Sequence, residues 1–215
     1  MSRFLALVVA VATATGLGCG MLPGMGGSGG SFKPAECYNT QFGGDLSSAK
    51  EGQYVTYATE AGGSKTSQTV KIVGKEGGDW LVEQWMDMGS MAYGMLFQIG
   101  GDKKIKKAWA AAKGDKEWTS ITVKETPASP TTEGEKPEIK ESSEKKEVKA
   151  GTFDCKRIDV KGKNYAATTW FSKDAPKIYI GGENGGAVAM EAAGSKTSLE
   201  AKGDDAKPTI ELPKK

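Results

Sequence analysis

The 215-residue chain contains no histidine. This absence excludes the Ser-His-Asp and Cys-His catalytic arrangements and the zinc sites that depend on imidazole, and it removes the commonest general base near neutral pH. Carboxylates such as Asp87 and Asp154 remain as candidates for catalysis, but we interpret them as solvated side chains. We therefore expect a protein that is not an enzyme and that uses no metal and no cofactor.

A large net charge and long apolar runs are also missing. The formal net charge is only +2, because 29 Lys and Arg residues are interspersed with 27 Asp and Glu residues. Without a basic stripe and interleaved aromatic residues, we expect no nucleic-acid partner. The longest apolar run, residues 4–14, is shorter than the roughly 20 residues that a membrane-spanning helix needs.

The N-terminus has the three parts of an export signal: a positive charge at Arg3, the apolar residues 4–14, and small residues after them. Two cleavage sites compete. Ala12-Thr13-Ala14 fits an ordinary site, which would release a soluble protein that begins at Thr15. Gly16-Leu17-Gly18-Cys19 resembles the signal of bacterial lipoproteins, although that family usually has leucine where this chain has Gly16.

The lipoprotein resemblance implies a signal peptide over residues 1–18, a covalent lipid on Cys19 and attachment to a membrane of the bacterial cell envelope. Gly20, rather than aspartate, follows the cysteine, and by resemblance to enteric lipoproteins this implies the outer membrane. The next residues are rich in glycine and serine, as flexible linkers are. We therefore interpret residues 19–35 as the acylated cysteine and a tether, and residues 36–213 as a single domain.

Only three cysteines are present. If Cys19 carries lipid, Cys37 and Cys155 remain as an even pair in an oxidising compartment, which favours a disulfide between them. The alternative is two small buried thiols.

Past the tether, short runs rich in β-branched and aromatic residues alternate with glycine-containing turns, a pattern typical of all-β proteins. Because the connections are short, successive strands should pair antiparallel. The expected strands are residues 53–59, 66–73, 80–88, 91–99, 103–111, 117–124, 148–160, 165–171, 177–180, 187–192 and 197–201. A meander of this length must curl or close to protect its edges, which predicts a barrel or half-barrel of about ten strands. The best helix candidate is a short turn at residues 45–51.

Residues 125–147 interrupt this pattern. They are rich in Pro, Glu, Lys and Ser and have almost no apolar side chain. Such a segment buries too little surface to offset the entropy of ordering, so we predict a disordered insertion. It would serve either as a docking segment for an envelope partner or as a tolerated insertion between strands.

Large, soft side chains gather in the middle of the predicted sheet. Methionine suits surfaces that accept varied apolar ligands, so we interpret this group as the lining of a cavity that could hold a lipid or acyl chain. The candidate cavity residues are Met91, Tyr93, Met95, Phe97 and Trp109. The alternative is that they form an ordinary hydrophobic core.

Three short segments resemble β-rich bacterial envelope proteins. The Gly-Thr-Phe segment at residues 151–153, the Trp-Phe-Ser segment at residues 170–172, and the opening Gly-Gln-Tyr-Val-Thr-Tyr at residues 52–57 carry this likeness. Some of those proteins resemble the lipoprotein-localisation carriers, whose half-barrels shield acyl chains. The resemblance implies an anchored lipoprotein that binds lipid or acyl chains. The alternative is a structural or interaction lipoprotein without a ligand pocket.

Overall fold

The computed structural model describes residues 36–126 and 136–213, and this part of the chain forms strands, turns and loops with no helix. The predicted signal peptide, lipidation site and tether lie outside the described residues. The strands are β1 Glu36–Tyr38, β2 Tyr54–Ala61, β3 Ser64–Glu76, β4 Asp79–Asp87, β5 Ala92–Ile99, β6 Ile105–Ala112, β7 Thr119–Lys124, β8 Glu138–Val148, β9 Gly151–Lys161, β10 Ala166–Ser172, β11 Gly181–Gly182, β12 Gly185–Ala192 and β13 Ser195–Gly203.

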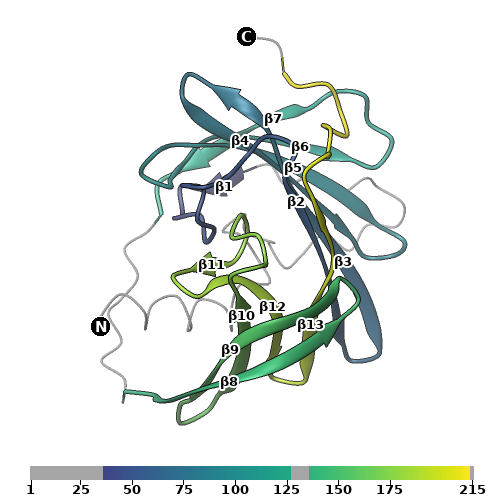
Figure 1. The fold of residues 1–215 in the computed structure, drawn as a ribbon. Coiled ribbons are helices and arrows are strands. Elements are labelled where there is room, and N and C mark those ends of the chain that lie inside the picture. Colours follow the sequence, from purple (N-terminus) through teal and green to yellow (C-terminus); the bar gives the residue numbers. More distant parts are fainter. Residues whose placement is uncertain (1–35, 127–135, 214–215) are drawn as a thin grey trace.

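All thirteen strands belong to one sheet. Their order is β1-β7-β6-β5-β4-β3-β2-β13-β12-β10-β9-β8, with β11 paired to β12, and every pair is antiparallel except β1 with β7. The sheet is not closed into a barrel, so the predicted half-barrel is confirmed. Figure 1 shows the strands curving around a concave side, with β1 and β11 lying within the curve.

The two faces of this sheet have different environments. The inner face carries the larger hydrophobic cluster, which includes Val70, Val82 and Phe97, all fully buried. The outer face carries a smaller cluster of Val73, Leu81 and Leu96, against which Trp109, Trp118 and Leu212 pack. Strand alternation places successive residues on opposite faces, so a strand can contribute to both clusters.

A C-terminal strap, residues 204–212, crosses the outer face and is fixed to a fully buried carboxylate. Glu83 accepts hydrogen bonds from Lys71 Nζ at 2.9 Å, from Trp85 Nε1 at 2.9 Å and from the backbone N–H of Thr209 at 2.9 Å. The Thr209 hydroxyl also donates to Glu83 at 2.5 Å. Because a buried carboxylate needs such partners, the strap completes the environment that lets Glu83 stay buried.

The interpretation of residues 125–147 as a disordered insertion is wrong for residues 138–147. These residues form most of β8, an exposed strand that pairs with β9 along its whole length. Cross-strand ion pairs such as Lys156–Glu141 at 2.7 Å contribute to this pairing, so the strand forms without burying apolar side chains. Residues 127–135 lie outside the described residues.

Three smaller expectations also fail. Residues 177–180 form no strand, because they cover the inner face as part of an irregular segment, and residues 45–51 form turns rather than a helical turn. The predicted single strand over residues 148–160 is divided by a turn at Lys149 and Ala150, and its parts belong to β8 and β9.

The predicted disulfide between Cys37 and Cys155 is absent from the structure. Both side chains are buried in the large cluster, as the alternative interpretation of two buried thiols expects. Cys37 is on β1 and Cys155 on β9, strands that stand ten places apart in the sheet order. A disulfide requires Cα atoms within about 7 Å of each other. Residues on neighbouring strands meet this requirement more readily than residues on strands so far apart in the sheet.

Candidate functional site

An irregular segment of residues 173–184, which we call the plug, covers part of the inner face between β10 and β12. Its apolar side chains Ala175, Ile178, Tyr179 and Ile180 belong to the large cluster. Pro176 has no N–H to donate to a strand ladder, and the plug has regular pairing only at Gly181–Gly182. The inner face is therefore covered by a loop rather than by a helix or a second sheet.

A few backbone hydrogen bonds fix the plug. Asp45 N donates to Lys177 O at 2.8 Å, Gly186 N to Ala175 O at 3.1 Å, and Ala187 N to Ile180 O at 2.9 Å. The contact with the segment before β2 is close, because a Cβ on Gly44 would lie 2.5 Å from Ile178 O. Glycine at position 44 thus lets the two loops pass at van der Waals distance.

The wall beneath the plug consists of aligned rows of side chains from β2 to β5. The first row is Tyr57, Gln68, Met86 and Tyr93, the second is Val55, Val70, Gln84 and Met95, and the third, from β3 to β5, is Ile72, Val82 and Phe97. The third row is fully buried, whereas Gln68, Met86 and Tyr93 in the first row are partly exposed. The inner face therefore changes from apolar to mixed and partly accessible along the strands.

Two tyrosines join the plug and the neighbouring β12 to this wall. Tyr179 OH donates to Gln68 Oε1 at 3.1 Å, and Tyr57 OH donates to Ala187 O at 2.7 Å. Their ring centroids are 5.8 Å apart. Burial raises the pKa of both hydroxyls above the usual range for tyrosine, so both groups are neutral donors near neutral pH.

Two amide atoms of the wall lack a hydrogen-bond partner in the described part of the chain. Gln68 Nε2, a donor, and Gln84 Oε1, an acceptor, are both buried and unpaired. Because Gln68 lies opposite Met86 and Gln84 opposite Val70 on neighbouring strands, the two amides are diagonal neighbours on one face. A buried polar atom without a partner is costly, and such atoms are often satisfied by water or by a ligand.

The structure brings together only part of the predicted cavity lining. Tyr93, Met95 and Phe97 share the inner face, with Met95 4% and Phe97 0% exposed. Met91 precedes β5 and is 48% exposed. Trp109 packs against the cluster on the outer face.

A β-bulge explains the position of Trp109. In the pairing of β5 with β6, Ile99 faces Ile105 but Gln98 faces Lys107, so Lys106 is an extra residue. The extra residue shifts the alternation, which puts Ile105 on the inner face and Trp109 on the outer face.

Sequence reasoning missed Gln68, Gln84 and Tyr179. The sequence does contain a signal that the two glutamines face inward. Each stands two residues from a buried valine, Val70 or Val82, and so shares its face of the strand. The signal for Tyr179 was hidden, because the residues around it were interpreted as a strand.

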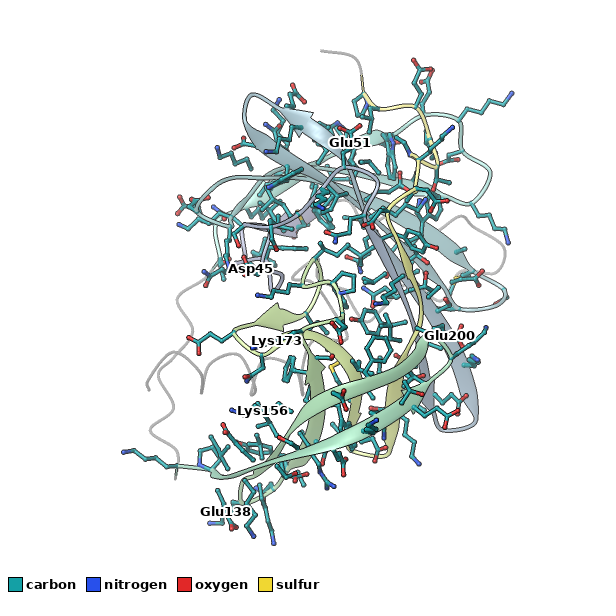
Figure 2. The ribbon with its side chains drawn as sticks, in the orientation of Figure 1. Asp45, Glu51, Glu138, Lys156, Lys173 and Glu200 are labelled. Carbon is teal, nitrogen blue, oxygen red and sulfur yellow. The ribbon has the colours of Figure 1, made fainter. Side chains whose placement is uncertain are left out.

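Clefts border the plug on two sides. A cleft of about 370 Å³ is lined by residues 173–177 together with Gln53 and Lys202. Another, of about 630 Å³, is lined by Lys173, Asp174 and Asn184 together with Cys155 and Phe171. Lys173 borders both clefts, and Figure 2 labels it on the plug. The plug is thus bordered partly by solvent-accessible space.

The described residues contain no group of three or more Cys, Asp or Glu side chains suited to hold a metal ion. They also contain no helix that is long and apolar enough to cross a membrane.

No protein-family model and no curated protein sequence match the chain. Among solved structures, the chain is similar to MucB in complex with MucA(peri), with a TM-score of 0.40 and 8% identity over 76% of this chain and 54% of that one. It is similar to MucB alone, with a TM-score of 0.36 and 10% identity over 74% of this chain and 56% of that one.

A third similar structure is a putative lipoprotein from Parabacteroides distasonis ATCC 8503, with a TM-score of 0.34 and 12% identity over 77% of this chain and 100% of that one. The chain spans about half the length of the two MucB chains. These similarities are distant, since identity is 12% or lower in all three.

Proposed function

We propose that this protein is a lipid-anchored binding protein of the bacterial cell envelope. In this proposal the chain is attached to the outer membrane through Cys19 and performs no catalysis. Its ligand is an acyl chain of a lipid or lipoprotein, which binds to the inner face of the sheet where the plug now lies.

One observation carries the proposal: a largely apolar inner face is covered by an irregular loop and contains two unpaired amide atoms. Plug side chains such as Ile178 and Tyr179 occupy apolar surface that an acyl chain would suit equally well. Gln68 Nε2 and Gln84 Oε1 offer one donor and one acceptor to a polar head group. Ligand sites of this kind combine mostly apolar walls with a few placed polar groups.

Access requires the plug to move. Tyr179 OH ties the plug to the wall through its hydrogen bond to Gln68 Oε1, at the partly exposed end of the inner face. Displacing Tyr179 would free that amide and uncover Met86, Tyr93 and Met95. Of the predicted cavity residues, Tyr93, Met95 and Phe97 then remain in the proposed lining, whereas Met91 and Trp109 do not.

Binding of a fluorescent fatty acid, dansylamino-undecanoic acid, tests this function. The chain carries Cys19→Ser so that no lipid is attached. We expect enhanced, blue-shifted emission on binding, and we expect Tyr179→Phe to bind about five-fold more tightly, because one hydrogen bond of about 1 kcal/mol no longer holds the plug. Tyr165→Phe, at an exposed tyrosine, is the matched control. Unchanged emission with both Tyr variants and with the parent would reject acyl binding.

A second candidate function is a structural or interaction lipoprotein without a ligand. Complete burial of Phe97 favours it, because a filled core leaves no space for a ligand unless the plug moves. Replacing residues 127–135 with a Gly/Ser sequence of the same length keeps the connection between β7 and β8 and removes part of the predicted docking segment. If this candidate holds, chemical crosslinking of envelopes should recover fewer partners with the replaced segment, and an unchanged set of partners would count against it.

A further inference from the structure

Strand β8 forms one edge of the sheet, and its side chains from Glu138 to Lys145 are all exposed. Among the described strands only β9 pairs with it. Figure 2 places Glu138 at the lower end of this hairpin. Within residues 36–126 and 136–213, one row of backbone N–H and C=O groups along this stretch therefore pairs with no strand.

Charged edges usually prevent such pairing, but this edge carries both signs. Its sequence from residue 138 is Glu-Ile-Lys-Glu-Ser-Ser-Glu-Lys, followed by Lys146. When a strand pairs antiparallel with a second copy of itself about a two-fold axis, one residue faces its own copy. That central residue fixes which side chains face each other.

Repulsion between like charges excludes almost every choice of the central residue that faces its own copy. A centre at Lys140, Glu141, Glu144 or Lys145 places like charges face to face. A centre at Ser143 places Lys140 opposite Lys146. A centre at Ile139 or Glu138 pairs too little of the strand.

A centre at Ser142 is free of these conflicts. It places Lys140 opposite Glu144 on both sides of the axis and Glu141 opposite Ser143. Ile139, which is 38% exposed, then faces the aliphatic stem of Lys145.

We propose that β8 is a self-association surface and that its partner is a second copy of this chain, paired antiparallel with Ser142 facing Ser142. The interface consists of backbone hydrogen bonds and two symmetry-related Lys140–Glu144 pairs, in which Glu144 keeps its contacts with Trp170 Nε1 and Arg157, and Lys140 exchanges Glu138 for the Glu144 of the second copy. The alternating charges specify one register, as inward and outward side chains do in buried strands. This inference is independent of the acyl-binding proposal, because β8 carries no residue of the inner wall.

Disulfide crosslinking of the exported full chain tests the register. Ser142→Cys is compared with Ser143→Cys in intact cells treated with a mild oxidant, and the products are separated without reductant. Facing cysteines at position 142 lie within disulfide reach. Cysteines at position 143 are offset by two residues, about 7 Å along the strand, and lie beyond it. We expect a dimer band at least five-fold stronger for Ser142→Cys, with the unsubstituted chain as the baseline for the native cysteines.

A charge reversal tests the proposed ion pair. Lys140→Glu, added to Ser142→Cys, places two carboxylates face to face, so we expect the dimer band to weaken several-fold. Lys163→Glu makes the same charge change on an exposed loop and should leave the band intact. Equal bands for cysteine at 142 and 143, no band for either, or a band unaffected by Lys140→Glu would each overturn the proposal.

Discussion

At the scale of single residues, Glu83 is the charged side chain whose environment depends most on distant parts of the chain. It is fully buried, and its partners come from β3, from β4 itself and from the C-terminal strap. Lys71 Nζ also donates to Thr209 Oγ1 at 2.6 Å, so the strap contacts both charges of the pair. The strap thus completes a network in which each charged group has several partners.

Glu83→Ala should lower the free energy of unfolding by about 3–5 kcal/mol, because it leaves Lys71 and the Thr209 N–H without their partner in a buried site. Urea denaturation measures this effect. The matched control is Glu200→Gln, which removes the more exposed pair with Lys65 at 2.9 Å and should cost less than about 1 kcal/mol. Equal costs for the two substitutions would contradict the role given to the buried network.

The inner tyrosines should make the protein sensitive to alkali. Burial raises the pKa of Tyr57 and Tyr179 in the folded state, whereas an unfolded tyrosine ionises at about pH 10. Their contribution to stability is therefore complete below about pH 10 and is lost as the pH rises through the folded-state pKa values. Tyrosinate absorbance should show Tyr57 and Tyr179 ionising only above the usual range for tyrosine. Tyr179→Phe should reduce the alkaline loss of stability, and an unchanged loss would contradict this account.

At the scale of elements, the outer face shows how one glycine shapes a strand. A Cβ on Gly94 of β5 would lie 2.6 Å from the ring of Trp85, which lies across it from β4. Trp85 also packs near Trp118, with ring centroids 6.1 Å apart. Any side chain at position 94 must therefore displace the indole.

Gly94→Ala should destabilise the protein by about 1–3 kcal/mol through overpacking. Gly101→Ala is the control, because a Cβ there meets no atom within 4 Å, and its effect should stay within about 0.5 kcal/mol. Thermal or urea unfolding compares the two. A shift of the Trp fluorescence with Gly94→Ala alone would locate the change at Trp85.

The strands of the meander from β2 to β7 could be predicted from the sequence, because alternation and glycine turns are local signals. Local signals could not reveal the extra residue Lys106, because it depends on how β6 pairs with β5. The sequence pattern therefore predicted the wrong face of the sheet for Trp109. Nor could local signals give β8, whose pairing with β9 stabilises a charged segment. The candidate site was predicted only as far as Tyr93, Met95 and Phe97, because the plug that covers them has no periodic pattern.

At the scale of the whole molecule, one hydrophobic cluster joins strands from both ends of the sheet order. Cys37 on β1 and Cys155 on β9 both belong to it. Burial raises the pKa of the Cys155 thiol, with further increases from Asp154 and Glu144. Burial of the side chain and the raised pKa both make the Cys155 thiol unreactive in the folded state.

Alkylation with iodoacetamide, without reductant, should therefore modify neither Cys37 nor Cys155 in the native protein and both of them in urea. Mass spectrometry counts the modifications. Reaction in urea only after a reductant is added would show that a disulfide joins the two residues after all. Modification of one thiol well before the other, at intermediate urea, would contradict a single cooperative core.

The pairing of β2 with β13 determines how late in synthesis the sheet can be completed. Strand Tyr54–Ala61 pairs with the adjacent strand Ser64–Glu76 on one side, but its other neighbour is Ser195–Gly203, and Tyr57 OH donates to a carbonyl 130 residues away. Contacts of such high sequence separation form late and slowly. The part of the sheet from β1 to β7 can therefore join the part from β8 to β13 only after Ser195–Gly203 has been synthesised.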